Sequence, residues 1–174
     1  MAVAINTHRF ILKEITEEDA SEPYLSWLRD PLSVKYIATA GMQNELSNLK
    51  QYIRERVGRR EVLFLGIFDS TSGQHIGNVK YEPVNEEMGY AIMGILIGEV
   101  TYRGKGVAKE VITASSKWLS ENRNIQEILL GVHTENAPAI KAYENMGFKV
   151  SETPFISKKV PGTLIMKLET VNLK

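Results

Sequence analysis

The sequence has no cysteine among its 174 residues. The chain can therefore form no disulfide, no thiolate metal site and no cysteine nucleophile. Its three histidines, His8, His75 and His133, are too scattered to give the short spacing typical of metal ligands. We expect a protein without a metal centre that works in a reducing compartment, namely the cytoplasm.

The sequence also lacks an excess of charge and a long apolar run. Lys plus Arg number 21 and Asp plus Glu number 21, so no overall field attracts nucleic acid or an anionic membrane. No segment approaches the roughly 18 apolar residues that span a bilayer, and residues 1–9 lack the apolar core of a secretion signal. We expect neither nucleic acid nor a membrane as a partner.

What the chain does have is the composition of a globular domain. Hydrophobic residues make up 43% and charged residues 24%, which is ordinary for a soluble fold. A length of 174 residues suits one domain with its own core, and no linker, repeat or low-complexity stretch divides it. We expect residues 1–174 to form a single domain that acts as a monomer or homodimer.

Hydrophobic periodicity predicts one α/β domain around a mixed sheet. Residues 8–15 alternate as a half-buried strand does. Thr16, with Asp19 three residues later, predicts a capping box for a helix that must end before Pro31. The other expected elements are helices at 46–58, 107–122 and 138–146, and strands at 62–68, 75–84, 88–98, 125–133, 149–150 and 163–168.

The turn between the strand at 88–98 and the helix at 107–122 reads Arg-Gly-Lys-Gly-Val-Ala. The first turn of a helix exposes unpaired N–H groups and the positive end of the dipole, which together attract phosphate. Gly104 and Gly106 let the backbone approach an anion, and Arg103 adds a cation. A plain turn with two glycines is the alternative, because neither named glycine fingerprint is present. The candidate ligands are Arg103, Gly104, Lys105, Gly106, Val107 and Ala108.

A second motif lies at residues 136–148. Asn136 can cap the short helix, and Pro138 falls in its first turn. Ile140 and Tyr143 are three residues apart and share a face of that helix. Taken alone, Tyr143 also fits a core aromatic, and Asn136 also fits a helix cap with no further role.

Together the two motifs resemble the GCN5-related N-acetyltransferase (GNAT) superfamily. Residues 103–108 match that family's Gln/Arg-x-x-Gly-x-Gly/Ala pyrophosphate loop, and residues 136–148 match its second acetyl-CoA motif. The order of expected elements fits over nearly the whole chain. The resemblance implies a GNAT fold of the α/β (α+β) class, with a mixed, mostly antiparallel sheet whose fourth and fifth strands splay apart, flanked by helices. It implies an N-acetyltransferase with acetyl-CoA as cosubstrate and no metal.

In that family the pantetheine arm of acetyl-CoA lies between the two splayed strands. The resemblance places this gap between the strands at 88–98 and 125–133, with Gly98 letting the first strand bend away. The loop at 103–108 would hold the pyrophosphate. Backbone contacts would come from Leu96, Ile97 and Gly98, and the pantetheine and thioester would be bordered by Asn136, Ala139 and Tyr143.

The resemblance also implies roles in the chemistry. A backbone N–H near Ile97 would stabilise the tetrahedral oxyanion, and Tyr143 would protonate the departing sulfur. Many relatives carry an acidic residue in an Ala-Asp/Glu-Ile-Gly-Ile strand, whereas residues 91–95 here read Ala-Ile-Met-Gly-Ile. Without that carboxylate the candidate bases are Glu99 and His133, acting through water. The alternatives are a solvated acid and a structural histidine.

The first half of the chain should form the acceptor side. Its residues 19–28 and 75–80 resemble a branch that includes amino-sugar-nucleotide acetyltransferases, beside the branch that acetylates N-termini of ribosomal proteins. The implied acceptor is a primary amine of a small molecule, with an amino-sugar nucleotide as one candidate. The alternatives are a protein N-terminal acetyltransferase and a non-catalytic CoA-binding module. The rings of Trp27, Tyr36 and Tyr81 are expected to stack on a sugar or nucleotide, and Lys80 is expected to contact an anionic group. Trp27 also fits a core position.

Overall fold

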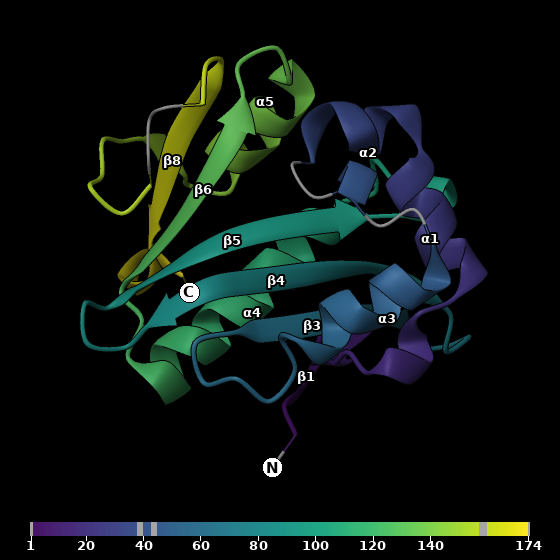
Figure 1. Ribbon diagram of the computed structural model, residues 1–174. Helices are drawn as coiled ribbons and strands as arrows, with labels where there is room; N and C mark the ends of the chain where they lie inside the picture. The colour runs from purple at the N-terminus through teal and green to yellow at the C-terminus, as the bar shows by residue number, and fades with distance from the viewer. Residues whose placement is uncertain (1, 38–39, 43–44, 157–159, 174) are drawn as a thin grey trace.

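The computed structural model describes residues 2–37, 40–42, 45–156 and 160–173. In these parts of the chain eight strands form one sheet, in the order β1-β2-β3-β4-β5-β6-β8-β7 (Figure 1). The strands are β1 (Ala4–Asn6), β2 (Phe10–Glu14), β3 (Leu63–Asp69), β4 (His75–Asn85), β5 (Tyr90–Ile97), β6 (Glu127–His133), β7 (Lys149–Val150) and β8 (Thr163–Glu169). The helices are α1 (Glu22–Arg29), α2 (Pro31–Tyr36), α3 (Leu46–Arg54), α4 (Val107–Arg123) and α5 (Ala137–Asn145).

The central feature of the sheet is the short pairing of β5 with β6. This pair is parallel, whereas the other neighbouring strands run antiparallel. Its register covers three residues of each strand, from Tyr90 to Ile92 and from Glu127 to Leu129. Beyond Ile92 the two strands diverge, as Figure 1 shows. The splayed pair expected from the resemblance is therefore confirmed.

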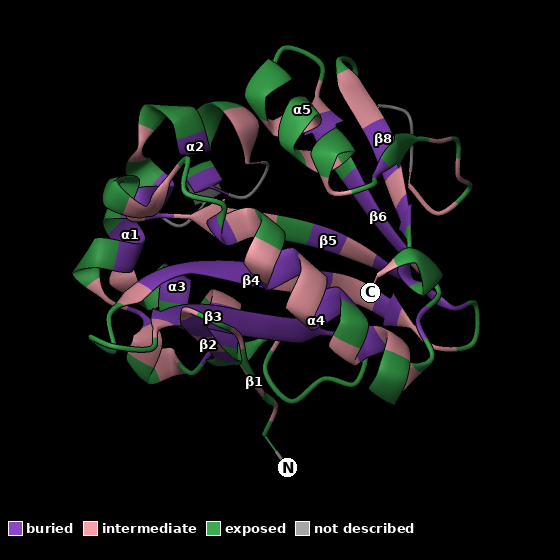
Figure 2. Cartoon of the chain, turned by 180° about the vertical axis from the view of Figure 1, so that it is seen from behind, coloured by how far each residue is buried: buried purple, intermediate pink, exposed green. Residues whose placement is uncertain are grey.

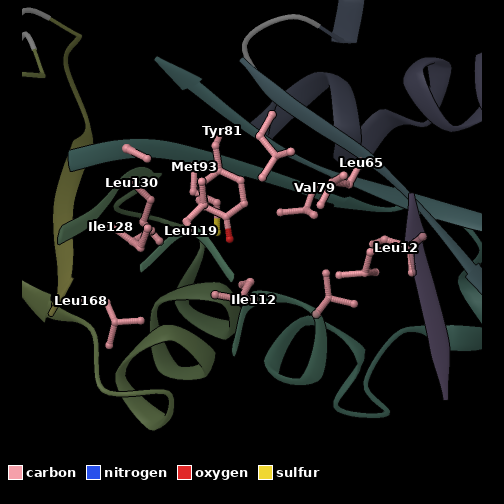
Figure 3. Packing of buried hydrophobic residues seen from close by; sticks show 14 of the residues in the cluster. Leu12, Leu65, Val79, Tyr81, Met93, Ile112, Leu119, Ile128, Leu130 and Leu168 are labelled. Atoms are coloured by element: carbon pink, nitrogen blue, oxygen red, sulfur yellow. The ribbon is translucent and has the colours of Figure 1, made fainter. Parts of the chain in front are cut away.

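Helices cover both faces of the sheet, and each face has its own buried cluster. α4 lies on one face and α1 and α3 on the other (Figure 1 and Figure 2). Val79 and Tyr81 of β4 pack with Leu119 of α4 (Figure 3). Phe64 of β3 packs with Leu49 of α3 on the opposite face. Residues of β4 and β5 therefore alternate between an α4 side and an α1–α3 side.

The N-terminal part differs from the expectation in three places. An additional edge strand, β1, pairs antiparallel with β2. The capping box of Thr16 and Asp19 is present, but it caps only a short 3-10 helix. The longer helix α1 starts later, where Ser21 Oγ accepts the N–H of Tyr24 at 3.3 Å. Pro31 ends α1 as expected and also opens α2, since proline is tolerated in the first turn of a helix.

The other expected elements are present with shifted ends. α3 stops at Arg54 instead of continuing to Gly58, whose φ of 79° turns the chain. α4 ends at Asn124, which adopts a left-handed conformation with φ of 52°. β4 and β5 form the expected hairpin, with Asn85 opposite Tyr90. The hydrophobic pattern thus located these elements, and local turn geometry fixed their ends.

His75 lies in an aromatic cluster under α1. Its Nε2 is 2.9 Å from both Gly77 O and Asn78 Oδ1, so Nε2 carries the proton and donates to these two acceptors. Burial lowers the pKa of His75 below its usual value of 6.5. The half-buried ring therefore stays neutral at physiological pH. Its ring neighbours are Phe68, Tyr24 and Trp27.

This environment predicts acid sensitivity. Because the pKa of His75 is lower in the folded state, its contribution to stability is present above about pH 6.5 and is lost as pH falls below that value. We expect the free energy of unfolding, measured by urea denaturation, to decrease from pH 7 to pH 5. Each unit of pKa lowering corresponds to about 1.4 kcal/mol. His75→Phe should flatten this decrease, and substitution of the exposed His8 by Gln should not. An unchanged pH dependence in His75→Phe would contradict the assignment.

Candidate active site

The gap between β5 and β6 is lined by backbone groups whose direction follows from the two-residue period of a strand. Gly89, just before β5, faces β6. Its carbonyl accepts hydrogen bonds from the N–H groups of Gln126 and Glu127, just before and at the start of β6, at 2.7 and 3.0 Å. Gly98, just after β5, faces β4, because its N–H donates to Ile76 O at 2.9 Å. Alternation therefore turns the N–H and C=O groups of Ile95 and Ile97 toward the gap. Since β6 has diverged there, it does not cover this edge.

Two of the three expected backbone contacts need correction. Leu96 faces β4 by the same alternation. The N–H of Gly98 is bonded to Ile76, and its carbonyl accepts from Arg103 Nη2 at 3.1 Å. Gly98 is required for another reason, because a Cβ there would lie 1.9 Å from Cδ2 of Trp27. Of the three residues, Ile97 alone presents its N–H to the gap.

The two glycines of the loop at 103–108 adopt left-handed backbone conformations. Gly104 and Gly106 have φ of 69° and 73°, a region that disfavours residues with a Cβ. Gly106 is the N-cap residue of α4 and has no side chain to occupy the N–H groups of the first turn. Both glycines are exposed, whereas Val107 is buried and anchors the helix in the core. The loop therefore offers backbone donors and the positive helix end to solvent.

The Arg103 side chain is not a free cation in this loop. Its Nε donates to Ile97 O at 2.9 Å, and Nη2 donates to Gly98 O. Its Nη1 lies 3.7 Å from Oδ2 of Asp30, at the junction of α1 and α2. The structure thus directs the Arg103 side chain to these groups, and its contact with a phosphate stays a prediction. Lys105 in the same loop is exposed and extends to solvent.

Arg9 is a residue of this loop region that the sequence analysis missed. It lies before β2, and its Nη1 donates to Lys105 O at 3.0 Å. Its Nε and backbone N–H each donate to the Glu110 carboxylate at 2.7 Å. Burial favours the neutral acid, but hydrogen bonds from Thr7 and Arg9 outweigh it and hold the pKa of Glu110 below its usual value. Arg9 is far from the loop in sequence, so this contact could not be predicted from the motif.

α5 places the second motif beside the end of β6. Asn136 Oδ1 accepts the N–H of Ala139 at 3.4 Å, so the expected helix cap is present. The Tyr143 ring meets Phe148 edge-on, with ring centroids 5.6 Å apart. Burial raises the pKa of Tyr143 to about 12, so its hydroxyl keeps its proton at neutral pH. No hydrogen bond from the described residues occupies that hydroxyl.

The two candidate bases have different partners. Glu99 Oε1 accepts the N–H of Trp27 Nε1 at 3.1 Å, which leaves the second carboxylate oxygen for other contacts. His133 Nδ1 accepts the N–H of Glu135 at 3.2 Å, so the neutral ring carries its proton on Nε2. A neutral His133 in this arrangement has no free lone pair to accept a proton. Its ring lies against Tyr36 of α2, with centroids 5.7 Å apart.

Two of the residues expected to contact the acceptor are core residues. Tyr81 is fully buried, and its hydroxyl lies 2.8 Å from Ser115 Oγ and 3.1 Å from Ser116 Oγ of α4. Trp27 is 5% exposed and packs over Gly98. Neither ring can stack on a ligand at the surface. Tyr81 shares the α4 side of the sheet with Val79, which lies two residues earlier in β4.

Lys80 and Tyr36 are accessible but already have neighbours. Lys80 Nζ donates to the Tyr52 hydroxyl at 2.6 Å and to Glu82 Oε2 at 2.8 Å. Arg56 Nε donates to the same Glu82 oxygen at 3.0 Å. Burial raises the pKa of Glu82, but the bonds from the two cations prevail and lower it overall. The group of Tyr52, Arg56, Lys80 and Glu82, here called the charged cluster, lies on the α1–α3 side.

Two negative findings apply to the described ranges. Within residues 2–37, 40–42, 45–156 and 160–173, no group of three or more His, Asp or Glu side chains is arranged to hold a metal ion. Over the same ranges, no helix has the length and apolarity needed to cross a membrane.

Known proteins share this arrangement. An N-alpha-acetyltransferase from Saccharolobus solfataricus is 36% identical over 72 residues, which is 41% of this chain and 42% of the relative. The chain thus covers less than half of that relative. A ribosomal-protein alpha-N-acetyltransferase in complex with coenzyme A has a TM-score of 0.81 at 9% identity, covering 96% of this chain and 98% of the other. The microcin self-immunity acetyltransferase MccE, in complex with acetyl-CoA and AMP, has a TM-score of 0.78 at 16% identity and 93% coverage of both chains.

At such identities the two solved structures establish a shared fold. The family follows from the sequence itself, because the model of the acetyltransferase (GNAT) domain matches residues 9–149. That span contains the splayed strands, the loop at 103–108 and α5. The chain therefore belongs to the GNAT acetyltransferase family.

Proposed function

We propose that this enzyme acetylates a weakly basic primary amine of a small molecule, bound on the α1–α3 side of the sheet. The observation that carries the proposal is the apolar surface of β5 beside the gap. Met93 is buried on the α4 side, and Ile92 is half-buried on the other. Neither can take a proton from an amine of pKa about 10.4, whereas an amine near pKa 8 loses its proton at a cost about 3 kcal/mol lower.

The same geometry supports a mode of cosubstrate binding. The pantetheine arm would lie between β5 and β6 and bond the backbone of Ile95 and Ile97. The pyrophosphate would bind the backbone N–H groups of the loop at 104–108, with the exposed Lys105 as a cation. Asn136 and Ala139 at the start of α5 would border the arm on the β6 side.

The chain's own groups then supply the chemistry. The N–H of Ile97 stabilises the oxyanion that forms when the amine attacks the thioester carbonyl. As the C–N bond forms and the C–S bond breaks, the Tyr143 hydroxyl gives its proton to the departing sulfur. The proton released by the amine passes through water to the free oxygen of Glu99. His133, which has no free lone pair, serves instead as a wall of the acceptor site beside Tyr36.

The charged cluster supports an acceptor with an anionic group. Arg56 and Lys80 both face Glu82, and Arg56 also lies 3.9 Å from Glu55, so an anionic group would compete with these two carboxylates for the two cations. The Tyr36 ring is half-buried and supplies a surface for a sugar or base. An amino-sugar nucleotide combines these features: a weakly basic amine, a ring and phosphates.

The second candidate acceptor is a protein N-terminus. The name of the Saccharolobus solfataricus relative favours it. An α-amino group has a pKa of about 7.7–8.0 and so needs equally little help with deprotonation. A CoA-binding module without activity is disfavoured, because Tyr143 is present and protonated.

The first test of this function concerns the pyrophosphate loop. Acetyl-CoA at about 100 times its Kd should stabilise the wild type by about 2.7 kcal/mol, seen as a higher melting temperature. Gly106→Val should abolish this shift, because a β-branched side chain covers the helix N-terminus. The matched control is Gly58→Val, which introduces the same strain at a φ of 79° with nothing within 4 Å. Both variants should lose similar stability without ligand. A full shift in Gly106→Val would remove the loop from the binding site.

The second test concerns the proton donor. Tyr143→Phe keeps the ring against Phe148 and removes only the hydroxyl. We expect kcat to fall on the order of 100-fold, with acetyl-CoA affinity nearly unchanged. Tyr90→Phe, at the start of β5, is the control and should keep kcat. A Tyr143→Phe enzyme with wild-type kcat would make Tyr143 a packing residue only.

The third test concerns the acceptor, in a screen that follows release of the CoA thiol. We expect kcat/KM to favour amino-sugar nucleotides over lysine side chains and spermidine, because their amines are less basic. Glu99→Gln keeps an oxygen for Trp27 and removes the proton acceptor. Its rate should fall at pH 7 and recover toward wild type near pH 9, where more of the amine is already neutral.

The outcomes of the screen separate the candidates. Preferred turnover of peptides with free N-termini would replace the small-molecule acceptor with a protein one. High activity on spermidine, with Glu99→Gln unaffected, would overturn the proposed preference for weakly basic amines.

A further inference from the structure

The helices on the acceptor side are attached to the segment that joins β5 to the pyrophosphate loop. Trp27 of α1 packs on Gly98 so closely that no Cβ fits between them. The same indole donates to the Glu99 carboxylate at 3.1 Å. Asp30, which is both the C-cap of α1 and the N-cap of α2, faces Arg103 across 3.7 Å. A residue of α1 and the residue at the α1–α2 junction thus contact residues 98–103.

Arg103 joins three parts of the molecule with one side chain. Its guanidinium bonds the carbonyls of Ile97 and Gly98 at 2.9 and 3.1 Å, which fixes it to the end of β5. Its third nitrogen faces Asp30 Oδ2, a buried atom that accepts no hydrogen bond from the described residues. Its own backbone begins the loop of Gly104 and Gly106. A displacement of this loop therefore reaches both β5 and the helix junction.

We propose that Arg103 is a positioning residue that couples the cofactor loop to the acceptor helices, so that binding of coenzyme A orders α1 and α2. This inference uses the acetyl-CoA site of the family and does not depend on which amine is acetylated. The pyrophosphate binds backbone N–H groups of the loop, and the Arg103 charge is directed to Asp30. By thermodynamic linkage, acceptor binding to α1 and α2 then favours cofactor binding by the same factor.

The strength of the coupling comes from geometry more than from charge. The side chains of Arg103 and Asp30 are 31% and 33% exposed, and a partly exposed ion pair alone contributes little. The two bonds to carbonyls are charge-assisted and hold the planar guanidinium in one orientation. A lysine at position 103 would keep the charge. It lacks the planar guanidinium that lets arginine contact both carbonyls and Asp30 at the same time.

The test measures amide hydrogen exchange across residues 22–36, with and without saturating coenzyme A. In the wild type, coenzyme A should slow exchange in this segment by about tenfold, a coupling within the usual range. Arg103→Gln and Asp30→Asn should each remove most of this slowing while changing the Kd for coenzyme A less than threefold. Arg103→Lys should behave like Arg103→Gln. A purely structural role would raise exchange equally in both states and leave the ligand-dependent difference intact.

Lys105→Gln is the matched control, since it removes the same charge from the same loop without touching Asp30 or β5. It should weaken coenzyme A binding and its salt dependence but keep the slowing at 22–36. Melting temperatures verify that each variant is folded. The proposal is overturned if coenzyme A does not slow exchange at 22–36 in the wild type, or if the slowing persists in Asp30→Asn. It is also overturned if Arg103→Gln weakens coenzyme A binding tenfold or more, because Arg103 would then be a phosphate ligand.

Discussion

The parting of β5 from β6 after Ile92 is the constraint on which the rest of the site depends. Backbone N–H and C=O groups of a central strand need partners, and β6 supplies none to Ile95 or to the N–H of Ile97, while the Ile97 carbonyl accepts from Arg103 Nε. A ligand with amide groups of its own can satisfy them. The parallel direction of the pair requires a crossover connection, which here is α4. The helix therefore begins near the open end of the gap, so one topological feature brings the unpaired strand edge and the helix N-terminus together.

The sequence predicted the parts of the structure that depend on local pattern. Strong periodicity located β3 to β6 and α4. The positive φ of Gly104 and Gly106 was not predicted and became visible only in the structure. Short elements such as β1 and α2 gave no comparable signal. The partners of Arg9 and Arg103 are also beyond the sequence, because Glu110 and Asp30 are far away along the chain. The sequence identifies the charged residue in a motif, but it does not show which group that side chain already contacts in the folded protein.

Gly98 shows that a residue can be required for a reason that the sequence does not reveal. A glycine at the end of a splayed strand suggests a bend, and the prediction stopped there. The structure shows that the Trp27 indole fills the space of the missing side chain. The same contact moves Trp27 from the acceptor surface into the core. The contact between Trp27 and Gly98, which are far apart in sequence, thus changes the interpretation of both residues.

In the proposed mechanism, the raised pKa of Tyr143 places a condition on its use as the proton donor. A hydroxyl of pKa about 12 is a weaker acid than a free phenol of pKa about 10. Transfer of its proton to a thiolate whose acid has a pKa of about 8.5 would be uphill by roughly 5 kcal/mol if the thiolate were in water. The thiolate does not form in water, however, but in the same apolar surroundings that raise the pKa of Tyr143. Desolvation disfavours both anions, so it raises the pKa of the leaving thiol as well and narrows the difference. Burial therefore keeps the tyrosine protonated and makes the departing sulfur a better acceptor for its proton.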